Sequence, residues 1–489
     1  MNPIEELSPK HVWKSFYALT QIPRPSGHTE KVAQFLVDFA KKNGAEARID
    51  EVGNVIMTKG ATPGYEDRET TVIQAHMDMV PQKTKDCQHN FETDPLDVYI
   101  ENGWVTARNT TLGADDGMGV AVAMAVIEDD TVEHGPIEVL ITRDEETGLY
   151  GAFGLKAGEL SAKYMLNLDS EEEGEITIGC AGGVDIICDM KYQELNVNPE
   201  NMLCYNIIIK GLLGGHSGIE IHKGRANANK LMARTLFATV NTGTAWLCSW
   251  HGGNMRNAIP RECEATVLVP APEKKAFLAM IEKCKDTFFD EYKDVETDAF
   301  KFFIEEVKDV PTKAIPEDIQ ENIINAVMAA HDGVLRYTPS LPDLVETSCN
   351  LAIINVGDGE AEIITLARSS QDSMKQYLVN SYVACFSMAG MEVKAEGGYS
   401  GWQPNPKSPL VTMMSDIYNG LYGKRPAVGA CHAGLECGII GVNYPDMDMA
   451  SYGPTIAHPH TPDEACNIES VEKFYKFTLE VLKNIPKKA

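Results

Sequence analysis

The sequence predicts an α/β domain with a mainly parallel central sheet, into which a separate α+β domain is inserted. Over residues 1–183, short apolar runs alternate with helical patterns, as in parallel sheets whose strands are joined by helices. From residue 184 the pattern changes to strands followed by helices with polar faces, and glycines near 396–402 mark a second boundary. We therefore expect one domain from residues 1–183 and 398–489, and an inserted domain from 184–397.

The elements of the first domain follow from apolar spacing. Segments with the period of amphipathic helices are residues 9–20, 29–43 and 470–484. Short continuous apolar runs, typical of buried strands, are residues 71–77, 137–141 and 164–168. Residues 120–127 predict a buried helix that opens at Gly117 and Gly119.

The inserted domain has a different pattern of apolar residues. Strand-like apolar runs are residues 206–209, 265–269, 300–307, 349–356 and 361–367. Helical patterns are expected over residues 226–240 and 273–289. The strands and helices do not alternate regularly, which favours the α+β class.

Charge and composition narrow the function. The 489 residues contain 43 Lys and Arg against 71 Asp and Glu, a net charge of −28. Such acidity argues against nucleic acid or an anionic membrane surface as a partner, because phosphate groups require a basic face. Most of the charge is expected on solvated surface. The remainder could be carboxylates gathered in a site that needs a cation.

The cellular location is predicted from the absence of targeting and membrane-spanning segments in the sequence. The first residues are acidic, without a basic region followed by an apolar run, and no stretch approaches 18 apolar residues. The 12 cysteines are scattered and include no CxxC pair. These features predict a cytoplasmic protein with reduced thiols and no membrane partner.

Histidine and acidic residues follow the ends of several apolar runs. His76 and Asp78 would point the same way on a strand, which suits a metal ligand and the carboxylate that orients it. Asp115 and Asp116 stand between glycines, where the backbone lets a ligand approach. Taken singly, each also fits an ordinary surface pair or helix cap.

Together these clusters indicate a metal site. Glu145 and Glu146 follow the run 137–141, and Asp169 follows 164–168. Ligands of open α/β sheets bind beyond the carboxyl ends of the strands, so these acids and Asp115 can converge there. Four carboxylates in one cleft would repel strongly without cations. Two divalent metal ions would balance them, and carboxylates with imidazoles suit zinc, with cobalt or manganese as substitutes.

A further histidine is expected from the proline-containing loop 453–464. His458 and His460 both lie in this loop, whose prolines hold the backbone rigid. The residues alone do not choose between the two histidines, and a surface loop would also explain them.

These motifs resemble the five metal-site motifs of the co-catalytic zinc aminoacylase/carboxypeptidase superfamily, in the same order. Within it, the chain resembles the bacterial aminoacyl-histidine dipeptidase branch, also described as Xaa-His dipeptidase or carnosinase-like. The resemblance also covers residues 23–27 and 432–437 and implies a zinc-exopeptidase-like fold. The five motifs are His76–Asp78, Gly113–Gly117, Asp144–Gly148, Asn167–Asp169 and His460–Glu464.

The resemblance implies a role for each candidate ligand. Asp115 would bridge two zinc ions. His76 and Asp169 would complete one metal site, and Glu146 and His460 would complete the other. His460 is preferred to His458 because the family ligand directly precedes the Thr-Pro-Asp-Glu segment.

The resemblance also implies the catalytic groups. Asp78 would orient His76, and Glu145 would act as general base on a metal-bridged water. The residues between Asp169 and His460 are too many for a loop, so they should contain the inserted lid.

Four further residues are implied to act with the lid or the substrate. His216 would help to hold the oxyanion, while Asn257 and Arg368 would bind the carboxylate end of the substrate. His432 would line the substrate pocket.

Three functions remain open from the sequence. The first is a metal-dependent dipeptidase for Xaa-His peptides, including β-alanyl-histidine. The second is an N-acyl amino acid amidohydrolase, which would share the metal chemistry. The third is a non-catalytic metal-dependent binding protein, although Glu145 counts against it. The expected partner is a small peptide, with no nucleic acid or membrane. A homodimer, the native metal, the side-chain preference and the position of the lid stay open.

Overall fold

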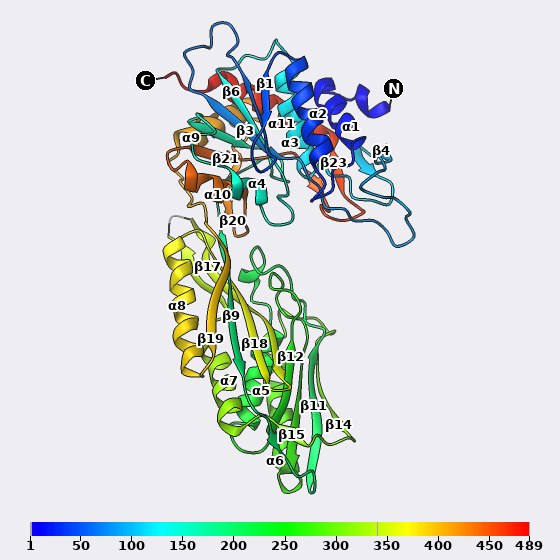
Figure 1. The fold of residues 1–489 in the computed structure, drawn as a ribbon, viewed down its shortest axis with the longest axis vertical. Coiled ribbons are helices and arrows are strands. Elements are labelled where there is room, and N and C mark those ends of the chain that lie inside the picture. The colour runs from blue at the N-terminus through cyan, green and yellow to red at the C-terminus, as the bar shows by residue number, and fades with distance from the viewer. Residues whose placement is uncertain (1, 340, 489) are drawn as a thin grey trace. The chain divides into compact units, whose positions relative to one another are not determined.

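The computed structural model describes residues 2–339 and 341–488, which form two compact units (Figure 1). Unit 1 comprises Met1–Gly179, Trp402–Ala430 and Leu435–Ala489. Unit 2 comprises Cys180–Gly401 and Cys431–Gly434. The predicted insertion 184–397 lies inside unit 2.

The short segment Cys431–Gly434 differs from the sequence-based division, which assigned it to the first domain. It belongs to unit 2 because its backbone and one side chain bond there. The amide of Ala181 donates to the carbonyls of Cys431 at 3.1 Å and Ala433 at 3.0 Å. His432 Nε2 lies 2.7 Å from Ser348 Oγ.

Unit 1 is built on an eight-stranded sheet in the order β1-β2-β6-β3-β7-β21-β8-β20. The four neighbouring strands β6, β3, β7 and β21 are parallel, so the predicted mainly parallel centre is confirmed. All six residues of β3 are buried, as expected of a strand covered on both faces. The strands are β1 (Glu46–Ile49), β2 (Val55–Lys59), β3 (Thr71–His76), β6 (Ile137–Thr142), β7 (Tyr164–Asn167), β8 (Glu175–Cys180), β20 (Ala427–Cys431) and β21 (Asp448–Ser451).

Helices cover the sheet of unit 1. Helix α3 packs on β3 and is buried by α1 and α2, which explains why it is apolar on every side. Helix α11 packs on α9. The helices are α1 (Lys10–Thr20), α2 (Glu30–Lys42), α3 (Ala114–Glu128), α4 (Tyr150–Gly154), α9 (Pro409–Tyr422), α10 (Glu436–Asn443) and α11 (Ile468–Asn484), with a 3-10 turn at Pro3–Glu6. A smaller sheet joins β4 (Val98–Glu101), β5 (Trp104–Ala107), β22 (Ile456–Ala457) and β23 (Ala465–Asn467).

Unit 2 is an α+β unit with one large antiparallel sheet. Its path is β14-β11-β13-β12-β17-β18-β9-β19, and β16 pairs with β17. The strands are β9 (Gly182–Lys191), β11 (Met202–Lys210), β12 (Trp246–Gly252), β13 (Cys263–Pro270), β14 (Lys301–Val307), β16 (Gly333–Thr338), β17 (Leu341–Gly357), β18 (Glu360–Ser369) and β19 (Glu392–Tyr399), and a separate pair is β10 (Leu195–Asn196) and β15 (Lys313–Ala314).

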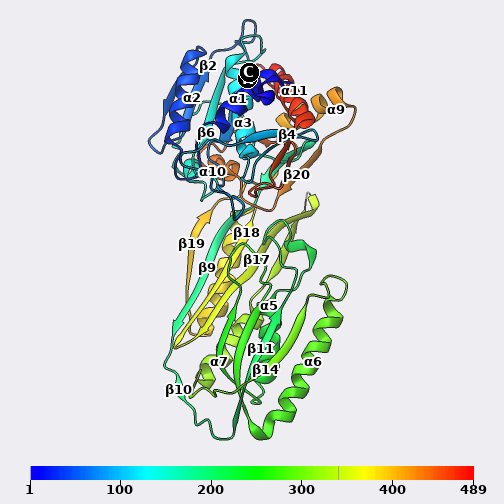
Figure 2. The same cartoon turned by 90° about the vertical axis from the view of Figure 1, so that its right-hand side faces the viewer.

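The helices of unit 2 form one layer along this sheet (Figure 2). Neighbours in the layer follow the order α8-α7-α5-α6, and α5, α6 and α8 each contact strands of the sheet. The core between the layers is apolar and fully buried at Leu231, Trp250, Phe277, Ile323 and Phe386. The helices are α5 (Ala228–Thr239), α6 (Lys274–Tyr292), α7 (Glu317–Ala329) and α8 (Asp372–Met388), with 3-10 turns at Ile221–Lys223 and Ala271–Glu273.

The predicted elements are confirmed to within a few residues, apart from strand ends that extend further than their apolar runs. Several elements were not predicted, among them β1, β9, β12, β21, α7 and α8. Within residues 2–339 and 341–488, no helix has an apolar stretch long enough to cross a membrane.

Candidate metal centre

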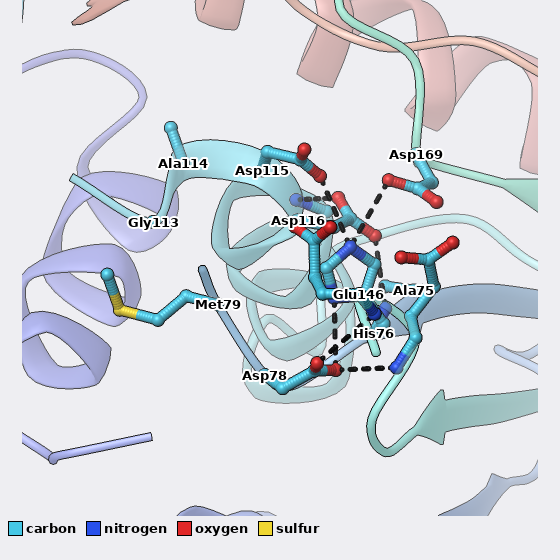
Figure 3. A network of polar contacts seen from close by, with 12 residues as sticks. Ala75, His76, Asp78, Met79, Gly113, Ala114, Asp115, Asp116, Glu146 and Asp169 are labelled. Atoms are coloured by element: carbon cyan, nitrogen blue, oxygen red, sulfur yellow. Dashed lines mark hydrogen bonds and ion pairs between the residues drawn. The ribbon is translucent and has the colours of Figure 1, made fainter. Parts of the chain in front are cut away.

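The predicted ligands converge at one edge of the parallel sheet of unit 1. Figure 3 shows four of them, His76, Asp115, Glu146 and Asp169. His76 ends β3, Glu146 follows β6, and Asp169 follows β7. Asp115 lies at the start of α3, where its backbone is not yet helical. His460 comes from the loop after β22. Parallel strands end at the same edge, which is why these separate segments meet.

Asp115 lies between two groups of ligands. Its Oδ1 is 3.2 Å from His76 Nε2, which is also 3.5 Å from Asp169 Oδ1. Its Oδ2 is 2.8 Å from His460 Nε2, which is also 2.9 Å from Glu146 Oε1. The two oxygens of one carboxylate thus serve two separate imidazole and carboxylate pairs.

Asp78 holds the surroundings of His76. Its Oδ1 lies 3.4 Å from His76 Nδ1, so the other ring nitrogen, Nε2, is left to face the ligands. Asp78 also accepts hydrogen bonds from Ser26 Oγ at 2.7 Å and from the amides of Glu145 at 3.1 Å and Glu146 at 3.3 Å. One buried carboxylate therefore orients a ligand from β3 and the loop after β6.

The three consecutive acids after β6 have different surroundings. Asp144 accepts from the amide of Gly27 at 2.6 Å and pairs with Arg143 at 2.6 Å. Glu146 joins the ligand group. The carboxylate of Glu145 makes no hydrogen bond to any described residue, so it is available to another polar group.

The protein groups alone leave the site with excess negative charge. Burial, together with the charges of Asp115 and Glu146, raises the pKa of Asp169 to about 7 although His76 opposes the shift. Burial and nearby carboxylates also raise the pKa of Glu145 well above its usual value. Hydrogen bonds to Asp115 and Glu146 raise the pKa of His460 to about 11. Without other cations, protons on the imidazoles supply the positive charge that offsets the carboxylates.

The donor set fits divalent metal ions. Ligand atoms of His76, Asp115 and Glu146 all lie within 4.8 Å of one another. Imidazole nitrogens with carboxylate oxygens are the donors that zinc, cobalt and manganese accept in proteins. Ions at this site would replace the protons on the imidazoles and relieve the repulsion between the acids.

Glu464 supports Asp115 from the other end of the chain. Its carboxylate accepts from the amides of Leu112 at 2.9 Å, Gly113 at 3.1 Å, Ala114 at 2.7 Å and Asp115 at 3.4 Å. Glu464 belongs to the sequence motif that contains His460, but the sequence predicted no role for it. Only its place in that motif could have drawn attention to it.

Arg24 is a second supporting residue that the sequence did not identify. Its side chain is 2% exposed and donates to the carbonyls of Met77 and Asp78 at 3.0 Å and of Gly113 at 2.5 Å. A Cβ at Gly117 would collide with the guanidinium, so the glycine is required by this close approach. Arg24 thus joins the His76 and Asp115 segments.

His216 lies in unit 2 as a neutral donor. Its Nδ1 accepts from the amides of Gly218 at 3.1 Å and Ile219 at 3.2 Å, so the ring proton is on Nε2. Burial and the charge of Arg368 lower the pKa of His216 to about 4. A neutral imidazole with a free Nε2–H can donate to an oxyanion.

Arg368 is a buried cation without a carboxylate partner. It is 5% exposed, donates to Ser217 Oγ at 3.4 Å and Tyr399 Oη at 3.1 Å, and forms no ion pair with a residue that the structure describes. A buried charge in this state favours an external anion. The side chain of Asn257 is exposed, and its carbonyl accepts from the amide of Ser217 at 2.8 Å.

Two other histidines are placed differently. His432 is 6% exposed, and its Nε2 bonds to Ser348 Oγ. This contact ties residues 431–434 to β17 within unit 2, and the predicted role of His432 in the substrate pocket stays a prediction. The imidazole of His458 is exposed and forms no hydrogen bond or ion pair with the described residues, whereas His460 faces Asp115 and Glu146.

Known proteins are similar to this chain in sequence and in fold. A model of peptidase family M20/M25/M40 matches residues 72–484. The cytosol non-specific dipeptidase of Escherichia coli (strain K12) is 41% identical over 488 residues, covering 100% of both chains. The crystal structure of aminoacylhistidine dipeptidase from Vibrio alginolyticus is 40% identical, with a TM-score of 0.93 over 100% of this chain and 99% of that one. A Staphylococcus aureus tripeptidase at 17% identity and a TM-score of 0.56, covering 98% and 99%, shares the fold.

Replacing Glu464 with alanine should weaken metal binding. The substitution frees four amides around Asp115, and loss of such supporting contacts typically lowers metal affinity by about 10- to 100-fold. Competition with a chelator measures the change. Glu469→Ala is the control, because that side chain is 77% exposed and, among the described residues, pairs with Lys473 alone. Equal affinities in the two variants would contradict the role of Glu464.

Proposed function

The chain belongs to peptidase family M20/M25/M40 and is a hydrolase of peptide bonds, and we propose its specific function on this basis. We propose that it is a metal-dependent dipeptidase. The family depends on metal ions, typically two. The observation that carries the proposal is Asp115, whose two oxygens face two separate ligand pairs. We assign His76 and Asp169 to one ion and Glu146 and His460 to the other. Zinc is the proposed metal.

Glu145 is the proposed general base. When bound, two divalent ions would acidify a water molecule and polarise the scissile carbonyl. The carboxylate of Glu145, which has no hydrogen-bond partner in the described chain, would take the proton from the attacking water and pass it to the leaving amine. Asp78 would keep His76 and the backbone of Glu145 in place during this transfer.

The groups of unit 2 would bind the rest of the substrate. The Nε2–H of His216 would donate to the oxygen of the scissile carbonyl as negative charge develops there. Arg368 and the exposed amide of Asn257 would bind the terminal carboxylate. This role is supported by the buried, unpaired guanidinium, because a carboxylate can accept two of its hydrogen bonds.

Dipeptides of the Xaa-His type, including β-alanyl-histidine, are the proposed substrates. The supporting likeness is to an aminoacylhistidine dipeptidase at 40% identity. The relative from Escherichia coli is named a non-specific dipeptidase, so we expect other dipeptides to be cleaved as well. The same relative is named for the cytosol, and we propose the cytoplasm as the location.

A substrate panel tests the class of reaction. With zinc, manganese or cobalt present, free dipeptides should be cleaved, and N-acetylation of the same dipeptides should abolish cleavage. Product formation is followed by chromatography for β-alanyl-histidine, a second dipeptide and N-acetyl-histidine. Preferred cleavage of N-acetyl-histidine would instead show an amidohydrolase of N-acyl amino acids.

Glu145→Gln should keep the metal ions and lose most of the activity. The amide cannot accept the proton, and loss of a general base costs about 10²- to 10⁴-fold in rate. Elemental analysis and kcat for β-alanyl-histidine are the two measurements. Glu172→Gln, at an exposed position of unit 1, should behave as the wild type. Wild-type turnover by Glu145→Gln would exclude this residue as the base.

Arg368→Lys should raise KM more than it lowers kcat. Lysine keeps the charge but loses the planar fork, and one charge-assisted hydrogen bond of about 1.5–3 kcal/mol corresponds to roughly 10-fold or more in affinity. The matched substrates are a dipeptide and its C-terminal amide, and only the free acid should be affected. Arg234→Lys, which alters a surface pair with Glu291, is the control variant. An equal rise in KM for acid and amide would argue against carboxylate binding by Arg368.

A further inference from the structure

Glu436 is a buried acid beneath the metal centre that the proposed mechanism does not use. It is the first residue of α10 and is 0% exposed. Its Oε2 accepts from Gln74 Nε2 and from Thr142 Oγ1, each at 2.6 Å. Its Oε1 is buried without a hydrogen-bond partner.

The hydrogen bonds of Glu436 belong to a chain that crosses three strands. Gln74 is on β3 and Thr142 on β6, and Gln74 Oε1 in turn accepts from Asn167 Nδ2 on β7. Gln74 and Asn167 are direct neighbours in the parallel pairing of β3 and β7. All four side chains are 0% exposed, so water does not compete for these bonds.

The same three strands carry the proposed ligands. Gln74 precedes His76 by two residues, so the two side chains lie on the same face of β3. Asn167 precedes Asp169 by the same interval, and Thr142 ends β6 just before Glu145 and Glu146. The chain of hydrogen bonds therefore lies one step below the ligands.

Burying a carboxyl group at this position is expected to lower the stability of the fold. Burial raises the pKa of Glu436 to about 8, against the hydrogen bond from Thr142 and the charge of His76. No cation donates a hydrogen bond to it among the described residues. The start of a helix stabilises negative charge nearby, but only by about 0.3–1 kcal/mol. An apolar side chain in α10 would avoid this cost, but would leave Gln74 and Thr142 with their longer contacts to the carbonyl of Ala75, each at 3.2 Å.

We propose that Glu436 is a positioning residue of the metal centre, which holds the ends of β3, β6 and β7 in register by accepting hydrogen bonds from Gln74 and Thr142. Fixed strand ends fix the points at which His76, Glu146 and Asp169 leave the sheet. The inference rests on the proposed metal-dependent function. Since it concerns the geometry of the ligands, it can be tested without turnover.

The test is the visible absorption spectrum and affinity of cobalt bound to the full chain. In Glu436→Ala both hydrogen bonds are lost, so cobalt should bind about 10- to 100-fold more weakly and its spectrum should change. In Glu436→Gln the amide oxygen can accept both bonds, so spectrum and affinity should return close to those of the wild type. Thr142→Val, which removes only the hydroxyl, should change the spectrum to a smaller extent.

Glu138→Ala is the matched control. Glu138 is a buried acid at the other end of β6, where it accepts from Ser161 Oγ at 2.7 Å and from the amides of Ser161 and Ala162. Its loss should lower Tm without changing the cobalt spectrum. This contrast separates a general loss of stability from displacement of the ligands.

Three results would overturn the inference. Wild-type cobalt spectra in Glu436→Ala or in Thr142→Val would show that the hydrogen bonds do not position the ligands. A Glu436→Gln variant as impaired as Glu436→Ala would show that charge, and not hydrogen bonding, is what matters. A wild-type chain that binds no cobalt would overturn the proposed function as well, whereas wild-type binding with an unaffected alanine variant would overturn the inference alone.

Discussion

The gathering of buried carboxylates around Asp115 is the constraint on which unit 1 depends. Asp115, Glu146 and Asp169 lie together, and among the described residues their ion pairs are with the imidazoles of His76 and His460. Charges buried in this way are tolerated only when they are paired with cations. The parallel sheet brings the acids together, and divalent ions would make that arrangement stable. The fold therefore accounts for the position of the acids, and bound cations would account for their stability.

The residues around the ligands act mainly on the backbone. Glu464 bonds to amides and Arg24 to carbonyls, and both contact the segment that presents Asp115. Asp78 does the same for the loop after β6. Each of these buried charges thus fixes a loop that has no regular secondary structure to hold it. A rigid site on loops needs such support, because loops are otherwise the more mobile parts of a fold.

The two units supply opposite chemistry. Unit 1 offers a concentration of acids that suits cations, and unit 2 offers the unpaired guanidinium of Arg368 beside a neutral His216. A dipeptide has a carbonyl that reacts when polarised by a cation and a carboxylate that binds to one. Each unit by itself therefore carries groups suited to one of these two parts of a dipeptide.

The ligands were predictable because they follow strong local signals. His76 and Asp169 come at the ends of continuous apolar runs, and the rule for parallel sheets then places them at one edge. Strand β21 was missed because Asp448–Ser451 is too short and mixed to show an apolar period. Glu436 and Glu464 were given no role because their partners are hundreds of residues away in the chain. Local pattern carries no information on such pairings.

The order of synthesis has a consequence for this arrangement. Unit 1 combines Met1–Gly179 with Trp402–Ala430 and Leu435–Ala489, and most of unit 2 lies between the first two of these segments in the chain. A ribosome that has completed β19 has made His76, Asp115, Glu146 and Asp169, but neither β21 of the central sheet nor His460. Nearly all of unit 2 apart from Cys431–Gly434 has been made at that stage and can begin to fold, since domains generally fold as they emerge. The proposed metal site therefore stays incomplete until residues 448–460 have been synthesised.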